Sequence, residues 1–402
     1  MVKKKTIYDT EITEYKPLIK YTGGKFKEYK NFSHLIPDVV GDYYEPFAGG
    51  AGVMFQMLND SRIIGHTHLN DISTELTAFY KVVGTDDFNK ALDEIADAWD
   101  AIKRIADVIV KAEWLPVHLY DIVTGDVKVA ELTKNPIFRG FVDHLFTDTT
   151  NLQDYFHRPS EAGGILVYHS YHILASIENK LVKFKNKYQK NKLHTFTPDN
   201  CNKQIQTSIL QSFYFAVRDM YNKERQKSVI TPEYLARWFF IREFCYGSMF
   251  RFSKNGFNVP YGGASYNDKD FRAKVDYLKS DDIAEVFGER MSVDNMDFEK
   301  YIEIQCYCDS DFVFLDPPYD STFNEYDSTA FTKEDQKRLR KAVESIKCRW
   351  MMVIRNTPFI KSLYKDYNMA AFDKNYAFHA RGTYDEKQCE HLVITNYDIN
   401  NI

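Results

Sequence analysis

Apolar and polar residues alternate with two different periods along the chain, and this divides it into regions. Short apolar runs separated by glycine-rich turns occupy residues 17–84, a pattern typical of βαβ units. Residues 42–47 predict a strand that runs into the loop 48–52, and a helix begins with residues 53–58. A second strand is expected near residues 62–69. The region therefore predicts one part of an α/β sheet.

A helical period replaces this pattern from about residue 85. Apolar residues recur at steps of three and four and predict an amphipathic helix, whose opposite face is acidic and expected to be solvated. The apolar residues are Leu92, Ile95, Ala96, Trp99, Ile102, Ile105, Ala106 and Ile109. The acidic residues are Asp87, Asp93, Glu94, Asp97 and Asp100. Residues 150–232 have no clear period, whereas residues 234–246 predict a buried helix.

Strand-like apolar runs return in the C-terminal part of the chain. Residues 312–315 suit a parallel strand that is buried on both faces. Residues 350–354 and 392–394 predict two further strands, and a helix is expected over about 332–346. We therefore expect one α/β sheet that is divided by a large, mainly helical insertion. The expected boundaries are 1–84 and 266–402 for the two parts of the sheet domain and 85–265 for the insertion.

Composition and charge exclude several classes of protein. The 402 residues are 44% hydrophobic with few glycines and prolines, which excludes a disordered chain and provides for a large core. A net charge of −5 excludes a uniformly basic nucleic-acid binder but allows a local basic groove. Residues 183–192 contain five lysines and no acid. This run either follows nucleic-acid phosphates or is a solvated surface.

The sequence also sets expectations about compartment and metals. No apolar run follows the N-terminal lysines, and none approaches 18 residues, so we expect neither a secretory signal nor a membrane span. The six cysteines are scattered and lack the paired spacing of a zinc site. We expect no metal site, and a cytoplasmic protein with reduced thiols.

The first candidate site is the glycine-rich turn after the first predicted strand. Gly49, Gly50 and Gly52 allow the backbone to approach a ligand closely, and the helix that follows favours polar or anionic groups at its N-terminus. Asp71 lies at the end of the next predicted strand, where an acid can bind ribose hydroxyls. The pattern indicates an adenosine cofactor. The alternative is a tight turn with a surface aspartate.

The second candidate site is Asp316-Pro317-Pro318-Tyr319, which directly follows the strand 312–315. The two prolines fix the backbone and remove two N–H donors, so the loop presents carbonyl groups and one carboxylate. Such acceptors suit an exocyclic amine, which has two N–H groups to donate. Tyr319 can stack on a planar base. The alternative is a rigid turn with a capping aspartate.

Together these motifs resemble the Dam-type, class alpha family of DNA adenine-N6 methyltransferases, which use S-adenosylmethionine. The resemblance covers roughly residues 17–84 and 234–397. The segments that carry it are Pro17-Leu18-Ile19-Lys20-Tyr21-Thr22-Gly23-Gly24-Lys25, Glu45-Pro46-Phe47-Ala48-Gly49-Gly50-Ala51-Gly52, Asn70-Asp71-Ile72, Asp316–Tyr319, Arg381-Gly382-Thr383 and Glu390–Tyr397. The order of cofactor loop, recognition region and DPPY motif is the class alpha arrangement.

The resemblance implies a fold and a set of site residues. The fold is a Rossmann-like S-adenosylmethionine-dependent methyltransferase sheet, with the insertion as target-recognition domain. The implied cofactor contacts are Tyr21, which replaces the family's usual Trp, and Lys25, Glu45, Phe47, Gly49, Gly52, Asp71 and Asp316. The implied catalytic residues are Asp316, Pro317 and Tyr319. The Asp316 carboxylate and the Pro317 carbonyl would accept hydrogen bonds from N6 of an adenine that is flipped out of the duplex onto Tyr319.

Residues 246–262 resemble the DNA-reading hairpin of the same family. Tyr246 and Met249 fall where apolar wedges enter the duplex, and Arg251 falls where a guanidinium can read guanine O6 and N7. Gly247 replaces the family's usual Asn and the loop is shorter, so no target sequence is assigned. The further residues expected at DNA are Lys254 and Asn258 in this stretch and Lys183, Lys185 and Lys187 in the lysine run. The alternative is an ordinary structural hairpin.

The leading interpretation is a site-specific adenine-N6 methyltransferase that acts on double-stranded DNA. We expect a bacterial or phage-encoded enzyme, for which a cognate restriction endonuclease is a further candidate partner. One alternative keeps the chemistry but changes the acceptor to RNA or to cytosine N4. Another alternative is a catalytically silent DNA-binding protein of the same fold. The aspartate at the first position of the DPPY motif and the hairpin both favour adenine in DNA.

Overall fold

A computed structural model describes residues 14–21, 23–112, 136, 140, 175–183, 185–186, 198–254, 256–319, 331–375 and 388–399. The chain divides into two compact units. The sheet unit comprises Met1–Thr85 and Leu278–Ile402, and the helical unit comprises Asp86–Tyr277. Residues 266–277, which the sequence analysis assigns to the sheet domain, therefore group with the helical unit.

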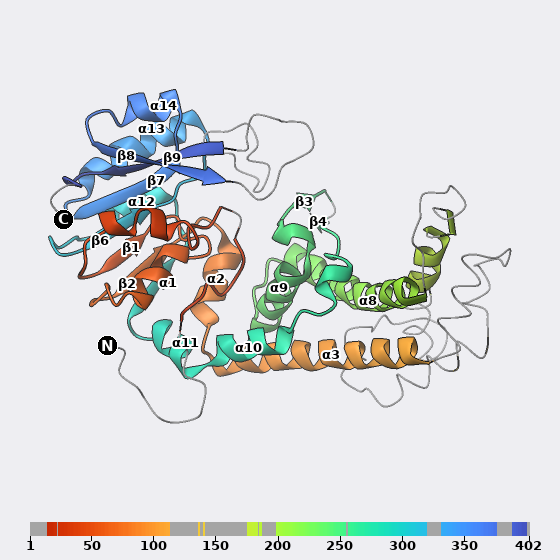
Figure 1. Ribbon diagram of the computed structural model, residues 1–402. Helices are drawn as coiled ribbons and strands as arrows, with labels where there is room; N and C mark the ends of the chain where they lie inside the picture. The colour runs from red at the N-terminus through yellow and green to blue at the C-terminus, as the bar shows by residue number, and fades with distance from the viewer. Residues whose placement is uncertain are drawn as a thin grey trace. The chain divides into compact units, whose positions relative to one another are not determined.

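Among the described residues, one mixed sheet of seven strands has the order β5-β2-β1-β6-β7-β9-β8 (Figure 1). The first five strands run parallel, and β9 runs antiparallel to both β7 and β8. The strands are β1 Tyr43–Glu45, β2 Thr67–Asn70, β5 Met291–Asp294, β6 Phe312–Leu315, β7 Arg349–Arg355, β8 Asn368–Asn375 and β9 Gln388–Thr395. The α/β class with a mainly parallel sheet is thus confirmed. The strand expected near residues 62–69 begins only at Thr67, because Ile63 forms an isolated bridge with Val40 instead.

The sheet has a switch point between β1 and β6, where successive strands of the chain begin to be added on the opposite side. The chain passes from β1 to β2 on one side, and from β6 to β7 on the other. In Figure 1 the red N-terminal strands accordingly lie beside the blue C-terminal ones. Open α/β sheets bind ligands at the carboxyl edge beside such a switch point. The glycine-rich loop follows β1 and Asp316 follows β6, so both candidate motifs lie at this edge.

Helices cover the sheet, and their apolar faces complete its core. The helices of the sheet unit are α1 Gly52–Asn59, α2 Thr74–Val82, α11 Asp281–Val286, α12 Phe298–Ile304, α13 Lys333–Ala342 and α14 Pro358–Leu363. Tyr301 from α12 and Leu339 from α13 join Leu315 and Trp350 of the strands in one buried cluster. The helix expected over 332–346 ends at Ala342, and a 3₁₀ turn follows it.

The helical unit is built around α3, the amphipathic helix that the sequence predicts. Within the described part of this unit lie α3 Asp86–Lys111, α8 Pro198–Gln226, α9 Pro232–Phe244 and, across the unit boundary, α10 Phe271–Lys279. All eight predicted apolar residues of α3 are buried, and Trp99 packs against Phe213 of α8 and Phe244 of α9. The buried helix predicted over 234–246 is confirmed as α9, which Thr231 caps by accepting a hydrogen bond from the Tyr234 N–H. None of the described helices is long and apolar enough to cross a membrane.

The sequence pattern did not predict α8. Its buried face includes Thr207 and Ser208, whose hydroxyls donate to the carbonyls of Lys203 and Gln204 within the helix. Such local bonds satisfy the buried hydroxyls, so polar residues can occupy a core-facing position.

The acidic face of α3 forms ion pairs with α10. Arg272 of α10 forms ion pairs with Asp93 at 3.3 Å, with Asp100 at 3.2 Å and with Asp97. The expected solvent exposure of this face is confirmed, and Arg272 adds a partner that the sequence did not indicate. The side chains of the three aspartates remain between a third and a half exposed, so each pair contributes little to stability by itself.

Candidate active site

The glycine-rich loop between β1 and α1 is held by contacts to its backbone. Tyr80 of α2 donates its hydroxyl proton to the Gly49 carbonyl at 2.7 Å, and the Gly49 N–H donates to Asp71 Oδ2 at 2.9 Å. Gly49 and Ala51 have left-handed φ angles of 47° and 50°. A Cβ atom on Gly52 would lie 2.8 Å from the backbone nitrogen of Phe26. The loop therefore needs glycine at position 52, where the 21–26 segment packs against it.

Asp71 is positioned by two backbone donors. Its Oδ2 accepts the Gly49 N–H, and its Oδ1 accepts the Ser73 N–H at 2.9 Å. Asp71 is 9% exposed, and each carboxylate oxygen can accept more than one hydrogen bond. The neighbouring Asn70 side chain donates to the Pro46 carbonyl at 3.0 Å, which ties the ends of β2 and β1 together. A carboxylate that is fixed by backbone N–H groups thus lies beside the glycine loop.

The aromatic residues expected at the cofactor occupy two different environments. The Tyr21 ring lies against the glycine loop, because a Cβ on Gly49 would approach ring atoms of Tyr21 to 3.1 Å. Tyr21 is 37% exposed and so presents aromatic surface at the loop. Phe47 instead packs against Phe298 and Phe331, with ring centroids 5.2 and 5.9 Å away.

Lys25 links the N-terminal motif to the DPPY motif. Its side chain is 1% exposed, and its ammonium group donates to Asp316 Oδ1 at 2.5 Å and to the Tyr319 hydroxyl at 3.1 Å. A third bond goes to the Gly23 carbonyl at 3.1 Å. The three acceptors match the three N–H groups of an ammonium. The sequence analysis expected Lys25 at the cofactor and did not foresee its bond to Asp316.

Glu45 is a buried carboxyl group at the end of β1. It is 2% exposed, and burial raises its pKa well above the ordinary value. The Tyr43 hydroxyl donates to Glu45 Oε2 at 3.0 Å and opposes this rise in pKa, whereas the charge of Asp316 adds to it. Glu45 therefore holds its proton to a higher pH than a solvated glutamate does.

The backbone of the DPPY loop is held by a residue that the sequence analysis missed. Gln336 of α13 is fully buried, and its side-chain amide donates to the Pro318 carbonyl at 2.9 Å. Pro317 is buried, whereas Pro318 is exposed. Gln336 lies in a highly charged helix, and no local pattern distinguishes it from a surface glutamine. Only the packing of α13 against the sheet reveals its contact.

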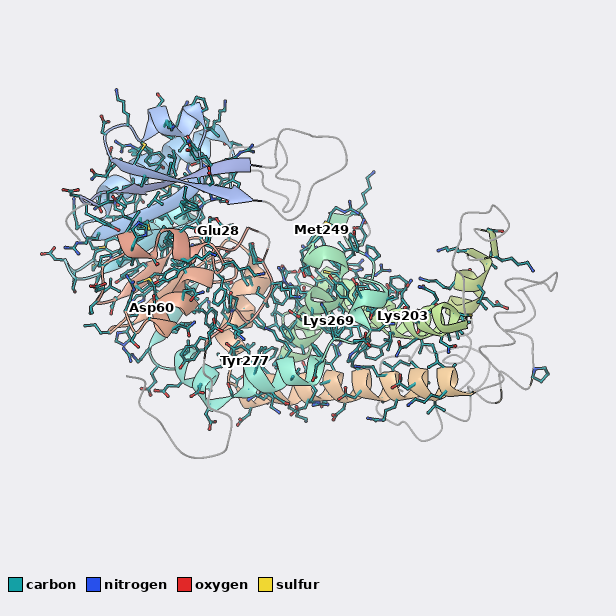
Figure 2. The ribbon with its side chains drawn as sticks, in the orientation of Figure 1. Glu28, Asp60, Lys203, Met249, Lys269 and Tyr277 are labelled. Carbon is teal, nitrogen blue, oxygen red and sulfur yellow. The ribbon has the colours of Figure 1, made fainter. Side chains whose placement is uncertain are left out.

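The candidate DNA-reading residues lie in a short hairpin of the helical unit. Strands β3 Phe252–Ser253 and β4 Gly256–Phe257 pair antiparallel, and Met249 lies beside them in Figure 2. Tyr246 is 44% exposed, and both Arg251 and Lys254 are exposed. Asn258 is also exposed, and its N–H donates to the Arg251 carbonyl at 3.3 Å.

A residue of α8 supports this hairpin through hydrogen bonds to its backbone. The Asn222 side chain donates to the Phe257 carbonyl at 3.0 Å and accepts the Phe257 N–H at 2.8 Å, as a neighbouring strand would. A Cβ atom on Gly256 would lie 2.5 Å from Asn222 Oδ1.

In the lysine run, Lys183 is exposed and Lys185 is half-buried, and Lys187 lies outside the described residues.

Comparison with known proteins identifies the family. The family described as D12 class N6 adenine-specific DNA methyltransferase matches residues 21–106 and 163–378, which is most of the chain. The chain belongs to this family. The match includes both motifs at the switch point and the hairpin, which are the segments that suggested it. It passes over residues 107–162 and ends before the C-terminal motif, of which residues 381–383 lie outside the described part of the chain.

Relatives of this D12-class chain include viral and bacterial enzymes. The type II methyltransferase M.CviBI of Paramecium bursaria Chlorella virus NC1A is 25% identical over 388 residues, which cover 95% of this chain and all of the relative. The type II methyltransferase M1.LlaDCHI of Lactococcus lactis subsp. cremoris is 29% identical over 46% of this chain and 66% of its own length. The retron Ec67 DNA adenine methylase of Escherichia coli is 27% identical over 38% of this chain and 52% of its own length.

Proposed function

We propose that this methyltransferase transfers a methyl group from S-adenosylmethionine to N6 of an adenine that is flipped out of duplex DNA. The observation that carries the proposal is the placement of the Lys25–Asp316 pair beside the Asp71-held glycine loop, at the switch point of the sheet. Target atom and methyl donor must meet within bonding distance, and this edge brings an amine-binding motif and a cofactor-binding motif together.

The residues at the loop fit S-adenosylmethionine by their chemistry. The Asp71 carboxylate is fixed by backbone N–H groups, and a carboxylate in this place can bind ribose hydroxyls. Tyr21 presents an exposed aromatic surface against Gly49 of the loop. S-adenosylmethionine, when bound, supplies a methyl group on a positively charged sulfur.

Asp316 and the Pro317 carbonyl would prepare the amine. The adenine N6 lone pair is delocalised into the ring, which makes N6 a weak nucleophile. Two acceptors for the N6 protons would localise this lone pair, and preorganised groups of this kind commonly contribute a few kcal/mol. Lys25 keeps one Asp316 oxygen fixed, so the carboxylate does not reorient during transfer. The bond between the methyl carbon and sulfur would break as the bond to N6 forms, which would leave a neutral thioether, and one of the two N6 protons would be lost to solvent.

The target adenine must leave the base stack before these acceptors can reach it. Enzymes that modify a base extrude it from the duplex and bind it in a pocket, often against an aromatic ring. Tyr319 directly follows the two prolines and is the aromatic residue of the motif. We assign to it the stacking contact with the extruded adenine.

The helical unit would supply the contacts to the DNA duplex. Tyr246 and Met249 would act as wedges, and Arg251 would read a guanine in the major groove. The further DNA contacts that we propose are Lys254, Asn258, Lys183, Lys185 and Lys187. The relatives named as type II methyltransferases support a sequence-specific enzyme, for which a cognate restriction endonuclease is the corresponding partner.

A methylation assay with labelled S-adenosylmethionine tests the proposal. The wild-type protein is expected to label duplex DNA, with the label in N6-methyladenine at one recurrent sequence. Asp316→Ala is expected to abolish transfer while DNA binding persists, and Asp38→Ala, at an exposed site of the same unit, serves as control. Label in cytosine or only in RNA, or full turnover by Asp316→Ala, would contradict the proposal.

A further inference from the structure

A fully buried histidine lies behind Tyr319. His391 of β9 is 0% exposed, and its ring meets the Tyr319 ring edge-on, with centroids 5.6 Å apart and planes at 68°. Phe372 of β8 meets His391 in the same manner at 5.6 Å and 69°. His391 Nδ1 lies 3.1 Å from Glu28 Oε2, and the Glu28 side chain is only 12% exposed. A polar pair is thus enclosed between the DPPY motif and the strand pair β8–β9.

Such a pair is a costly way to fill a core. Removing an imidazole and a carboxyl group from water costs free energy, and two apolar side chains would fill the same volume without that cost. The presence of this buried polar pair is therefore better explained by a need to hold neighbouring side chains in a defined geometry. In Figure 2, Glu28 lies where N-terminal segments of the sheet unit meet the C-terminal strands.

Glu28 and Lys25 belong to the same turn of the backbone. The N–H groups of Glu28 and Tyr29 both donate to the Lys25 carbonyl, at 3.0 and 2.9 Å. Lys25 donates a hydrogen bond to the Tyr319 hydroxyl, and Glu28 lies 3.1 Å from the histidine whose ring contacts the Tyr319 ring. One turn therefore restrains both ends of the same side chain.

We propose that Glu28 and His391 are positioning residues, which fix the plane of the Tyr319 ring for stacking on the extruded adenine. The inference rests on the proposed function, in which Tyr319 is the stacking surface. Lys25 alone fixes only the hydroxyl, and the ring could still rotate about the axis through that oxygen. The edge contact with His391 removes this rotation, because a turned ring would collide with the imidazole.

The backbone of the loop is held separately from the ring. Gln336 bonds to the Pro318 carbonyl, and Lys25 bonds to Asp316. Neither contact involves Glu28 or His391. Substitutions of Glu28 or His391 are therefore expected to disturb the ring of Tyr319, while Asp316 and the cofactor loop stay in place.

The test compares two variants with matched controls. Glu28→Gln removes the charge at nearly constant shape, and His391→Phe keeps a ring but removes the partner of Glu28. Glu334→Gln and His34→Phe make the same changes at exposed positions of the same unit. The measurements are the single-turnover rate constant of methyl transfer and the dissociation constants for S-adenosylmethionine and for DNA. A duplex with 2-aminopurine at the target position reports stacking of the extruded base.

The positioning role predicts a selective effect on the chemical step. Both variants are expected to lower the single-turnover rate constant by about tenfold or more, because a small misplacement of reacting groups is costly. Both dissociation constants should change less than about twofold, which a general loss of structure would not allow. The 2-aminopurine fluorescence should rise, since the extruded base stacks less well. The double variant should be no slower than the slower single variant, because the residues act as a unit.

Other outcomes overturn the inference. Wild-type rates in both variants would show that the pair does not position Tyr319. Loss of cofactor affinity in proportion to the loss of rate would assign it a structural role only. If His391→Phe does not fold, Glu28→Gln decides alone. A wild-type protein that methylates no adenine would contradict the proposed function itself, and the positioning role would fall with it.

Discussion

Lys25 Nζ lies 2.5 Å from Asp316 Oδ1, although 291 positions separate the two residues in the chain. The contact joins the N-terminal motif to the DPPY motif at the switch point between β1 and β6. Lys25 is almost fully buried, whereas the Asp316 side chain is 19% exposed. The carboxylate is thus held from the protein side and open towards solvent, as a group that must receive a substrate requires.

Lys25→Met is expected to impair both catalysis and stability. Removal of one partner of a buried pair leaves the other without compensation, which commonly costs about 3–5 kcal/mol, and less where the carboxylate is partly exposed. Thermal unfolding and single-turnover methylation measure the two effects. Lys27→Met, at an exposed position two residues on, is the matched control. A variant with wild-type turnover would contradict the role of Lys25 in fixing Asp316.

Gly52→Ala is expected to weaken cofactor binding. The added methyl group would lie 2.8 Å from the Phe26 nitrogen, so the loop or the 21–26 segment must shift. Overpacking of this kind typically costs about 1–3 kcal/mol. Titration calorimetry with S-adenosylmethionine measures the effect. Gly140→Ala, where an added Cβ meets no described atom within 4 Å, should bind as the wild type does.

Glu45→Gln is expected to alter the pH dependence of stability. Burial raises the pKa of Glu45 in the folded chain above its ordinary value of about 4.5. Its contribution to stability is therefore complete below that value and is lost as the pH rises towards the folded-state pKa. The glutamine cannot lose a proton, so the variant should gain in Tm relative to the wild type as the pH rises above about 4.5. A pH-independent difference, as expected for the control Glu334→Gln, would contradict the shifted pKa.

Arg251→Ala is expected to relax the sequence specificity of methylation. A bidentate contact to guanine O6 and N7 discriminates against other bases by about 1–3 kcal/mol. Lys254→Ala should instead weaken binding to all sequences and reduce its dependence on salt concentration, because a phosphate contact carries no sequence information. Methylation of a library of single-base variants of the target site separates the two effects. Equal losses on every sequence for Arg251→Ala would contradict a base contact.

Asn222→Ala is expected to impair DNA recognition without direct contact to DNA. The variant loses both hydrogen bonds to the Phe257 backbone, so the β3–β4 hairpin loses its support from α8. Affinity for target DNA should fall by up to about thirtyfold, at about 1 kcal/mol for each of the two hydrogen bonds lost, while affinity for S-adenosylmethionine is unchanged. Gln226→Ala, at an exposed end of the same helix, is the control. Unchanged DNA binding would show that the hairpin does not depend on Asn222.

Local sequence patterns were sufficient to predict many of the helices and strands. The run 312–315 is strand β6, and the apolar steps from Leu92 to Ile109 lie within α3. Short-range patterns determine these elements, because β6 is a continuous apolar run and α3 buries one apolar face of helical period. Helix α8 and the partial neutralisation of the α3 aspartates by Arg272 were missed. The buried hydroxyls of α8 are satisfied by carbonyls of the same helix, whereas the aspartates of α3 pair with an arginine that is far away in sequence.

The sequence by itself determined the family and the class of fold, because the glycine-rich turn and the Asp-Pro-Pro-Tyr loop are recognised by their residue types and their order. Only the tertiary structure decided that Lys25 bonds to Asp316, that Gln336 holds Pro318 and that His391 abuts Tyr319. The order of strands in the sheet brings these residues together, and that order follows from the packing of the whole sheet unit rather than from any one segment.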